Sequence, residues 1–545
     1  PVCSVARTTL ITSVYAPRLG TQYHRKIHTI PLPEGWKMFP AILNEAGYYT
    51  TNHVKTDYNA EESPDTWNES SRDATWRNRR DKSQPFFHMQ SFAESHESTL
   101  HFSREQMENQ KTDTDPASVT LAPYHPDTST FRYTYARYHD RIKVIDKKIG
   151  EVVKQLEEDG LLEDTFVFYF GDHGGVLPRG KGYVYESGLH VPLVVRVPKK
   201  YEHLVTLPVG SRTNGFVSFI DFGPTLLNLA GLDVPAYMDG KPFLGPNVSP
   251  EDLNARDETF GHADRFDEKY EMVRTLRKGN LKYHRNYQGY YPDGLQNNYR
   301  YNMLAYREWR DLYEAGKLNE VQSAFFQSKP PEALYDLEKD PHETVNLAGD
   351  QAYADRLGEM RNRLGKLVRE MPDLSIMPEP IMIQMMKESG REFREHLPEM
   401  LNFIAQAYEI ADLAVLPFDR SREELQKSVT TGDQAVNYWA LTVCCQFGKS
   451  AASLEDVVRE QLTNRDLLIR LRAAEFLAII GAEKPQATIM DILKTSEDPV
   501  VNLMVLQSVV FLRDVHGYKF EISPDDVTAK IQEVERRIEY LSQPE

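Results

Sequence analysis

One segment constrains the fold more than any other: an amphipathic helix that leads into a short apolar strand and a glycine-rich turn. From Tyr138 to Leu156, apolar residues recur at steps of three and four, which predicts a helix with one buried face. Residues 165–170 are then almost continuously apolar, as in a parallel strand covered by helices on both faces. The strand ends in Gly-Asp-His-Gly-Gly at 171–175. Because parallel sheets bind ligands beyond the carboxyl ends of their strands, this turn is a candidate functional site.

The same alternation of strands and helices extends over residues 1–235, which we expect to form an α/β core. A second strand of the parallel, buried kind is expected at 191–197, and a helix at 220–229.

Residues 236–372 are predicted to form a smaller second domain. Strand-like pieces at 271–276 and 281–286 are typical of a small antiparallel sheet. A charged amphipathic helix is predicted from Asp350, a possible N-cap, to Met371.

From residue 373 to 545 the sequence predicts helices only, and a pattern recurs in them. An Asp followed by an apolar helix begins at Asp433, Asp466 and Asp498, at spacings of 33 and 32 residues. This spacing is typical of stacked helical pairs of the HEAT kind, and an unrelated helical bundle is the alternative. Cys444 and Cys445 fall inside the first of these helices, where we expect small core residues, not a redox pair.

The composition argues against several classes of protein. Sixty-four Lys and Arg against 81 Asp and Glu give a net charge of −17, which disfavours non-specific nucleic-acid binding. A mean hydropathy of −0.54 and the lack of a long apolar run predict no membrane-spanning helix. Three cysteines cannot form enough disulfide bonds to stabilise a chain of 545 residues, so packing must stabilise the fold. The sequence starts at Pro1 without a signal peptide, from which we expect a processed chain or a fragment.

Cys3 and Arg7 lie at the start of a predicted helix, four residues apart. Helix N-terminal amides and a guanidinium both favour negative charge and lower the pKa of a thiol, so the pair suits anion chemistry. A buried structural cysteine is the plainer alternative.

The turn after the apolar strand places Asp172 and His173 where both can face one ion, and carboxylate oxygens suit a hard cation such as calcium. Arg179 and Lys181 follow shortly afterwards. Two cations so close to a metal-binding turn indicate an anionic ligand; a solvated basic loop is the alternative.

Polar groups also follow two other predicted strands. Lys55 and Asp57 come after the strand-like segment 47–52, and His96 comes after 85–90. Taken singly, each is equally consistent with a solvated surface side chain.

Taken together and in this order, these segments resemble the type I sulfatase family of the alkaline-phosphatase superfamily. The resemblance covers residues 1–347, and the residues of the motifs are most similar to those of bacterial heparan N-sulfatase-like sulfatases. The first motifs are the Cys-x-Pro/Ala-x-Arg signature, which begins at Cys3, the Lys of the second signature at Lys55, and the His after the next core strand at His96. The metal-binding turn follows at Asp172-His173 and the catalytic Lys at Lys181. The family's later helix motif matches residues 218–231, and its closing-strand motif matches residues 334–341.

The resemblance implies an alkaline-phosphatase-like mixed sheet flanked by helices, and a sulfatase that hydrolyses sulfate ester or sulfamate groups of sulfated carbohydrates. It implies that a formylglycine-generating or anaerobic maturation enzyme converts Cys3 to formylglycine, whose hydrate attacks sulfur. It further implies Ca²⁺ as cofactor, with Asp172 and His173 as metal ligands. Periplasmic or extracellular localisation follows from the same likeness.

The resemblance also implies a role for each remaining candidate. Arg7 would hold the formylglycine hydroxyl and the metal-binding carboxylates, and Lys55 and Lys181 would stabilise charge on the transferring sulfuryl group. His96 would protonate the leaving group. The expected substrate-binding residues are His24, Asp57 and Arg179. With Arg25 and Lys26, the cations of this set would form a basic mouth.

The chain departs from the family pattern at three places. Val5 stands where the signature has Pro or Ala, and Asp57 where many relatives have His. The family's two adjacent Asp metal ligands precede the signature and have no counterpart after Pro1. From this last difference we expect weak calcium binding and a central gap in the sheet.

Two other functions stay open at this point. One is a phosphodiesterase or phosphonate hydrolase of the same superfamily, although one calcium and two lysines suit the single charge of a sulfate ester better. The other is a catalytically silent binding protein that uses the helical repeats to bind a glycan or protein partner. The repeats could also mediate oligomerisation.

Overall fold

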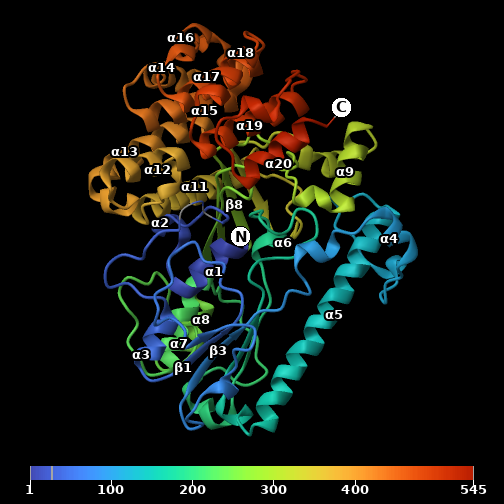
Figure 1. Cartoon of the computed structure of the whole chain (residues 1–545), viewed down its shortest axis with the longest axis vertical. Helices are drawn as coiled ribbons and strands as arrows, with labels where there is room; N and C mark the ends of the chain where they lie inside the picture. Colours follow the sequence, from blue (N-terminus) through green and yellow to red (C-terminus); the bar gives the residue numbers. More distant parts are fainter. Residues whose placement is uncertain (1, 26, 28, 544–545) are drawn as a thin grey trace.

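The protein is described from a computed structural model, which covers residues 2–25, 27 and 29–543. Figure 1 shows strands and short helices at one end of the long axis, and the C-terminal helices packed together at the other. The N-terminal helix lies between these two ends. Pro1 and Lys26 fall outside the described residues.

Three parallel strands in the order β2-β1-β3 form the first sheet: β1 (Tyr49–His53), β2 (Glu69–Ser70) and β3 (Phe86–Gln90). Three helices pack beside this sheet: α1 (Cys3–Thr12), α3 (Phe39–Glu45) and α7 (Phe222–Leu229). Ile11, Phe39 and Leu227 of these helices share a core with Phe87 of β3. The core therefore fixes the C-terminal half of α1 against the parallel sheet.

The expectation of a second parallel strand is wrong. β4 (Val167–Phe170) and β5 (Leu193–Arg196) pair antiparallel, with Val167 opposite Arg196. The chain between them folds into turns and the four-residue helix α6 (Glu186–Leu189), so it lacks the crossover helix that usually returns a chain for parallel pairing. Among the described strands, β3 pairs only with β1 and β4 only with β5, so two sheets stand where the sequence predicted one sheet with a central gap.

The predicted amphipathic helix is present and longer than expected. Helix α5 (Ser129–Glu158) begins earlier because Thr128 caps it, its hydroxyl accepting from the amide of Phe131. Gly160, just past its end, adopts a left-handed conformation with φ of 68°. Figure 1 shows α5 running along one side of the α/β part.

The predicted antiparallel sheet is confirmed and has four strands in sequential order: β6 (Glu258–Ala263), β7 (Val273–Lys278), β8 (Leu281–Asn286) and β9 (Glu332–Asp336). Helix α11 (Ala354–Glu370) packs against β7 and β8. Asp350 caps the 3-10 turn that leads into this helix, as the sequence predicted.

The C-terminal region is helical throughout, as predicted. Its helices are α12 (Glu379–Ser389), α13 (Leu397–Asp412), α14 (Phe418–Ser428), α15 (Gln434–Phe447), α16 (Glu455–Glu460), α17 (Leu467–Ile480), α18 (Gln486–Thr495), α19 (Pro499–Asp514) and α20 (Gln532–Leu541). Asp433, Asp466 and Asp498 each accept backbone amides as N-caps of α15, α17 and α19. These three helices stack in sequence, α15 on α17 and α17 on α19. The HEAT-like assignment stays a prediction.

Shorter helices complete the described chain: α2 (Ala16–Leu19), α4 (Arg104–Asn109), α8 (Pro250–Asn254), α9 (Leu304–Glu314) and α10 (Glu320–Ser323). Nowhere in the described ranges is a helix both long and apolar enough to cross a bilayer.

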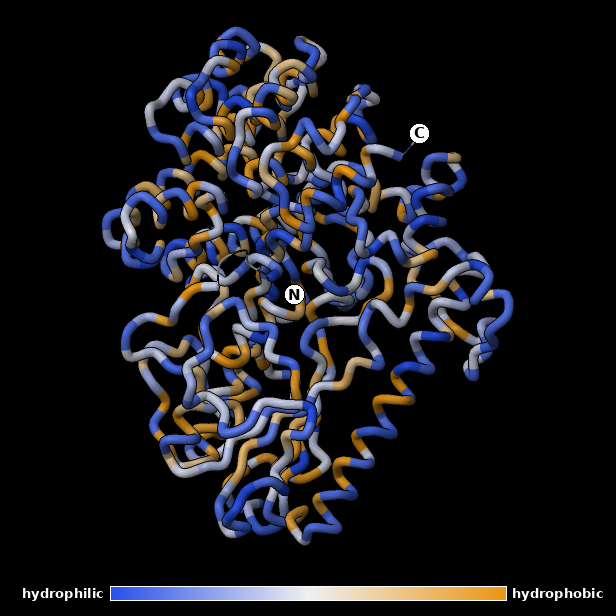
Figure 2. The backbone as a smooth tube through the Cα atoms, viewed as in Figure 1, coloured by the Kyte–Doolittle hydropathy of each residue, from blue (hydrophilic) through white to orange (hydrophobic). Residues whose placement is uncertain are grey.

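One apolar core joins the antiparallel sheet to the helical region. Leu276 and Tyr283 of the sheet belong to the same buried cluster as Trp439, Phe476 and Phe511 of the helices. Figure 2 shows the apolar residues of the helical region concentrated toward the inside of the stack. The helices thus pack directly onto the sheet. Cys444 and Cys445 are free and buried within this core, as expected.

Candidate active site

Cys3 is the first residue of α1 and is 1% exposed. Its Sγ lies 3.3 Å from Nε2 of His173. Burial raises the pKa of the Cys3 thiol, but hydrogen bonds to His173 and His96 and the charge of Lys181 outweigh burial and hold that pKa well below its ordinary value. The site is therefore built to stabilise negative charge at the position of Sγ.

Asp172 and His173 form the turn directly after β4. Nδ1 of His173 donates to the carbonyl of Gly174 at 2.8 Å, which leaves Nε2 facing Cys3, and Nε2 lies 3.5 Å from Oδ1 of Asp172. Burial alone lowers the pKa of His173 and raises that of Asp172. Their mutual attraction reverses both shifts, so the pKa of His173 lies above and that of Asp172 below its ordinary value.

Gly174 shows how closely this turn is packed. A Cβ at this position would lie 2.1 Å from the carbonyl oxygen of Ser187 and 2.6 Å from Cα of Gly188. Only glycine fits this close approach, which seats the turn against the start of α6.

Lys55 and Arg7 link the ends of the parallel strands to this turn. Nζ of Lys55 lies 3.8 Å from Oδ2 of Asp172 and 3.7 Å from Oδ2 of Asp57. Arg7 is buried; its guanidinium donates to the carbonyls of Lys55 and Thr56 and to Oγ of Ser91. Arg7 therefore holds the loop that carries Lys55, a role that the sequence did not predict.

Lys181 forms a buried ion pair with Glu97. Its Nζ lies 3.3 Å from Oε2 of Glu97, and the two side chains are 4% and 3% exposed. The rings of Phe266 and Tyr299 both lie 5.7 Å from Nζ. Burial lowers the pKa of Lys181, but Glu97 and Cys3 outweigh burial and raise that pKa above its ordinary value. A charged ammonium is thus held beside Cys3.

His96 immediately precedes Glu97 and lies beside Cys3, whose thiol pKa it helps to lower. Its Nδ1 lies 2.9 Å from Oγ of Ser98, and its ring lies 6.4 Å from that of Tyr299. With Nδ1 engaged by Ser98, the other ring nitrogen is the one available to Cys3.

The three residues expected to bind substrate have different surroundings. Asp57 faces Lys55 and also accepts from Nε of Arg25 at 3.5 Å. His24 stacks on the ring of Phe266 at 4.9 Å, and its Nδ1 lies 2.8 Å from Oδ1 of Asp267. Both residues therefore adjoin the group around Cys3.

Arg179 is buried between the rings of Tyr124 and Tyr185, at 4.3 Å and 3.5 Å. Its guanidinium donates to the carbonyls of His342 and Glu343. These contacts are structural, and the predicted contact with substrate stays a prediction.

Several residues of the site escaped the sequence analysis. Glu97 follows His96 directly and could have been found as a carboxylate next to a candidate acid. Phe266, Asp267 and Tyr299 come from beyond the α/β core, and no motif singles them out.

The donor atoms of Cys3, Asp172 and His173 all lie within 4.8 Å of one another. Among the described residues this is the one such group of ligating side chains. Its carboxylate is the kind of ligand that calcium prefers, whereas a sulfur and an imidazole nitrogen suit softer metals. Asp172 would thus supply one oxygen ligand of a calcium site, and the ammonium of Lys55 already lies 3.8 Å from this carboxylate.

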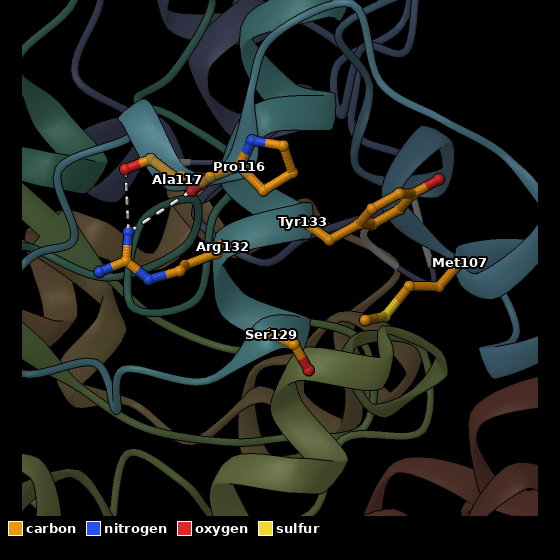
Figure 3. Close-up of a pocket in the computed structure, with 6 residues that line it drawn as sticks. All are labelled: Met107, Pro116, Ala117, Ser129, Arg132 and Tyr133. Atoms are coloured by element: carbon orange, nitrogen blue, oxygen red, sulfur yellow. Dashed lines mark hydrogen bonds between the residues drawn. The ribbon is translucent and has the colours of Figure 1, made fainter.

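The molecule also has a mainly apolar hollow of about 520 Å³, shown in Figure 3. It is lined by residues of α4, of the start of α5 and of the segment between them, among them Met107, Pro116 and Tyr133. None of the ten predicted site residues, all within the described ranges, lines it. This hollow is therefore separate from the charged group around Cys3.

Comparisons with known proteins bear on the family of the chain. Residues 1–232 match the sulfatase family model. The chain is 34% identical over 427 residues to an ulvan-active sulfatase of Formosa agariphila, covering 70% of this chain and 69% of that protein. It is 26% identical over 273 residues to human N-sulphoglucosamine sulphohydrolase, covering 48% of this chain and 52% of that protein. A solved structure of a complex with D-glucosamine-2-N,6-O-disulfate is 17% identical with a TM-score of 0.46, covering 68% of this chain and 89% of that one.

Proposed function

The chain belongs to the sulfatase family of sulfuric ester hydrolases, and on this premise we propose that it removes sulfate ester or sulfamate groups from sulfated carbohydrates through Cys3. One observation carries the proposal: the Cys3 sulfur lies beside the turn of Asp172 and His173, with the ammonium of Lys181 acting on it. This arrangement suits attack on an anionic sulfur centre. The names of the two relatives support the choice of a sulfated saccharide as substrate.

Cys3 is the proposed position of the nucleophile. In this family the cysteine of the signature is generally converted to formylglycine. Converted in this way, Cys3 would supply a hydroxyl for attack on sulfur. His173, His96 and Lys181 stabilise negative charge at this position, since they outweigh burial and lower the pKa of the thiol.

Lys181 and Lys55 are proposed to bind the oxygens of the sulfuryl group. Lys181 is charged, buried and held by Glu97, so it is already oriented when substrate arrives. Lys55 is half-exposed between two carboxylates and can contact an incoming anion.

His96 is the proposed acid for the leaving group, because it lies beside Cys3 with one ring nitrogen free of the Ser98 contact. Asp57 and His24 are proposed to contact the sugar, and Arg179 is proposed as a third substrate-binding residue.

Calcium is the proposed cofactor, with Asp172 and His173 as ligands. When bound, the ion would supply positive charge that stabilises the sulfate oxygens and the nucleophile. Periplasmic or extracellular localisation and a maturation enzyme for Cys3 are proposed with it, supported by the family. Binding of a partner or a second copy through the helical region is proposed from the helical stack alone.

The test combines a mass spectrum of the Cys3 peptide with sulfate release from defined sulfated mono- and disaccharides. We expect a loss of roughly 18 Da from Cys3, the mark of a covalent conversion to formylglycine despite Val5. We also expect sulfate release from at least one saccharide. An unmodified Cys3 with no sulfate release would favour a silent binding protein, and release of phosphate alone from phosphonate or phosphodiester substrates would favour the other hydrolase class.

A further inference from the structure

The last two helices of the chain hold the loop that forms one wall of the candidate site. We propose that, through this loop, the C-terminal helical region positions Lys181, so that Gln507 and Arg537 are positioning residues of the active site. The catalytic consequence rests on the proposed function, whereas the positioning itself does not.

Lys181 is held by side chains from two loops that lie far from it in the sequence. Phe266 and Tyr299 place their rings beside its ammonium. Nη2 of Arg300 donates to the carbonyl of Lys181 at 3.0 Å, and the same guanidinium stacks on the rings of Phe266 and Tyr183, at 4.2 Å each. The position of Lys181 therefore depends on residues 266 and 299–300.

These two loops are bonded to each other. Nδ2 of Asn297 donates to the carbonyl of Phe266 at 3.1 Å, and Oδ1 of Asn297 accepts from the amide of Arg300 at 3.0 Å. The amide of Asn298 donates to the carboxylate of Glu268. A shift of one loop must therefore move the other.

Side chains of α19 and α20 form hydrogen bonds with the backbone of these two loops. Arg537 of α20 is fully buried; it donates to the carbonyl of Glu268 at 3.0 Å and to that of Gln296. Gln507 of α19 is 1% exposed, and its side-chain amide bonds both backbone groups of Tyr270, donating to the carbonyl at 2.8 Å and accepting from the amide. Gln507 thus takes the place of a neighbouring strand.

These contacts are directional, unlike the apolar packing around them. Between Ala263 and Val273 the chain has no regular strand or helix. Phe266 and Lys269 pair with each other, but the buried backbone groups of Tyr270 and the carbonyl of Glu268 need partners from elsewhere. Removing a partner leaves a buried polar group unsatisfied, which the loop can relieve only by moving. A small displacement of a charge-stabilising group lowers the rate of catalysis steeply. We therefore expect movement of the loop to displace Lys181 and to lower that rate.

The test replaces Gln507 by Met, which keeps its volume and removes both hydrogen bonds to Tyr270. The matched control is Gln446→Met in α15. Gln446 makes the same kind of contact, accepting from the amide of Tyr290 at 3.0 Å and donating to the carbonyl of Lys329 at 3.2 Å. Arg537→Lys, which keeps the charge, serves as a second variant if Gln507→Met fails to fold by circular dichroism.

The first readout is the rate at which reductive methylation labels Lys181, followed by mass spectrometry of its peptide. We expect labelling about 10-fold faster in Gln507→Met and Arg537→Lys than in Gln446→Met or the parent chain, because lost hydrogen bonds make opening easier. The second readout is sulfate release, where we expect kcat to fall about 10-fold or more with KM little changed.

Equal labelling of Lys181 in Gln507→Met and Gln446→Met would overturn the positioning proposal. An unchanged kcat in a folded Gln507→Met variant would overturn its catalytic part. A parent chain that releases no sulfate would overturn the proposed function alone, since the labelling rates would still decide whether α19 and α20 position Lys181.

Discussion

The α/β part and the helical part stabilise their structures by different means. Every residue of β3 and β4 is only half-buried, and charged pairs such as Lys181 with Glu97 surround the ends of these strands. In α19, by contrast, residues 500–512 are all buried. The comparison teaches that apolar packing stabilises the helices, while the candidate active site is held by charge and by polar contacts from those helices.

The largest difference is expected between the cysteines of the two regions. Cys3→Ala removes the proposed nucleophile and should lower kcat by at least about 10⁴-fold, as removal of a covalent nucleophile does. Cys444→Ala should leave kcat unchanged and cost about 1 kcal/mol of unfolding free energy, because it removes a small buried group. Sulfate release and urea unfolding measure both. Substantial sulfate release by Cys3→Ala would contradict the expected difference between Cys3 and Cys444.

The next test compares two buried ion pairs. Glu97→Gln leaves the ammonium of Lys181 without its carboxylate, and Glu475→Gln does the same to the guanidinium of Arg472, which is 1% exposed. Each should lower the unfolding free energy by about 3–5 kcal/mol. Only Glu97→Gln should also lower kcat, since Arg472 lies within the helical core. An equal loss of activity in both variants would show that the two regions are not functionally distinct.

Packing is the third test. Leu471 of α17 is fully buried, and Leu471→Ala should cost about 2–5 kcal/mol of unfolding free energy through lost burial and a cavity. Val194 of β5 is 60% exposed, so Val194→Ala should change the unfolding free energy by less than about 0.5 kcal/mol. Thermal and urea unfolding give both values; similar costs would contradict the contrast in packing.

The smallest contrast is expected from pH, at the buried pair of Asp267 and His24. Burial raises the pKa of Asp267, but its hydrogen bond with His24 outweighs burial and lowers that pKa to about 2. Because the folded pKa lies below the unfolded value near 4, the pair stabilises the fold above about pH 4 and loses this effect as the pH falls toward 2. This contribution is about 2 kcal/mol.

Asp267→Asn should therefore lower the unfolding free energy at pH 6, and its difference from the parent should shrink as the pH falls below 4. Urea unfolding at several pH values measures this difference. A difference that stays constant between pH 6 and 3 would show that the carboxylate of Asp267 does not stabilise the fold by this route.

Much of the fold could be predicted from local patterns. The period of apolar residues predicted α5, and the recurring Asp residues predicted the N-caps of α15, α17 and α19, because both features act within one or two helical turns. The direction of β5 could not be predicted. Strand direction depends on the path of the connecting chain, and the apolar run at 191–197 is the same for either direction.

The residues of the candidate site also divide into those that could be predicted from the sequence and those that could not. Cys3, Lys55, His96, Asp172 and Lys181 each lie at the start of a helix or beyond the end of a strand, so sequence order and strand topology were enough to bring them forward as candidates. The partners of these residues could not be predicted, because Phe266, Tyr299 and Arg537 come from segments with no motif. Arg7 shows the limit even for a motif residue, since its contacts are with the Lys55 loop.

The sequence by itself determined where α5, α11, the capped helices α15, α17 and α19 and most strands form, which residues are candidates for the chemistry and that the chain resembles sulfatases, since all of these reside in short patterns along the chain. Only the tertiary structure decided that Glu97 pairs with Lys181, that β4 and β5 run antiparallel, and that α19 and α20 support the active-site loop. The physical reason is that buried charges and loop carbonyls need partners in space. Such partners are supplied by whichever segment the packing brings near, here one more than two hundred residues away along the chain.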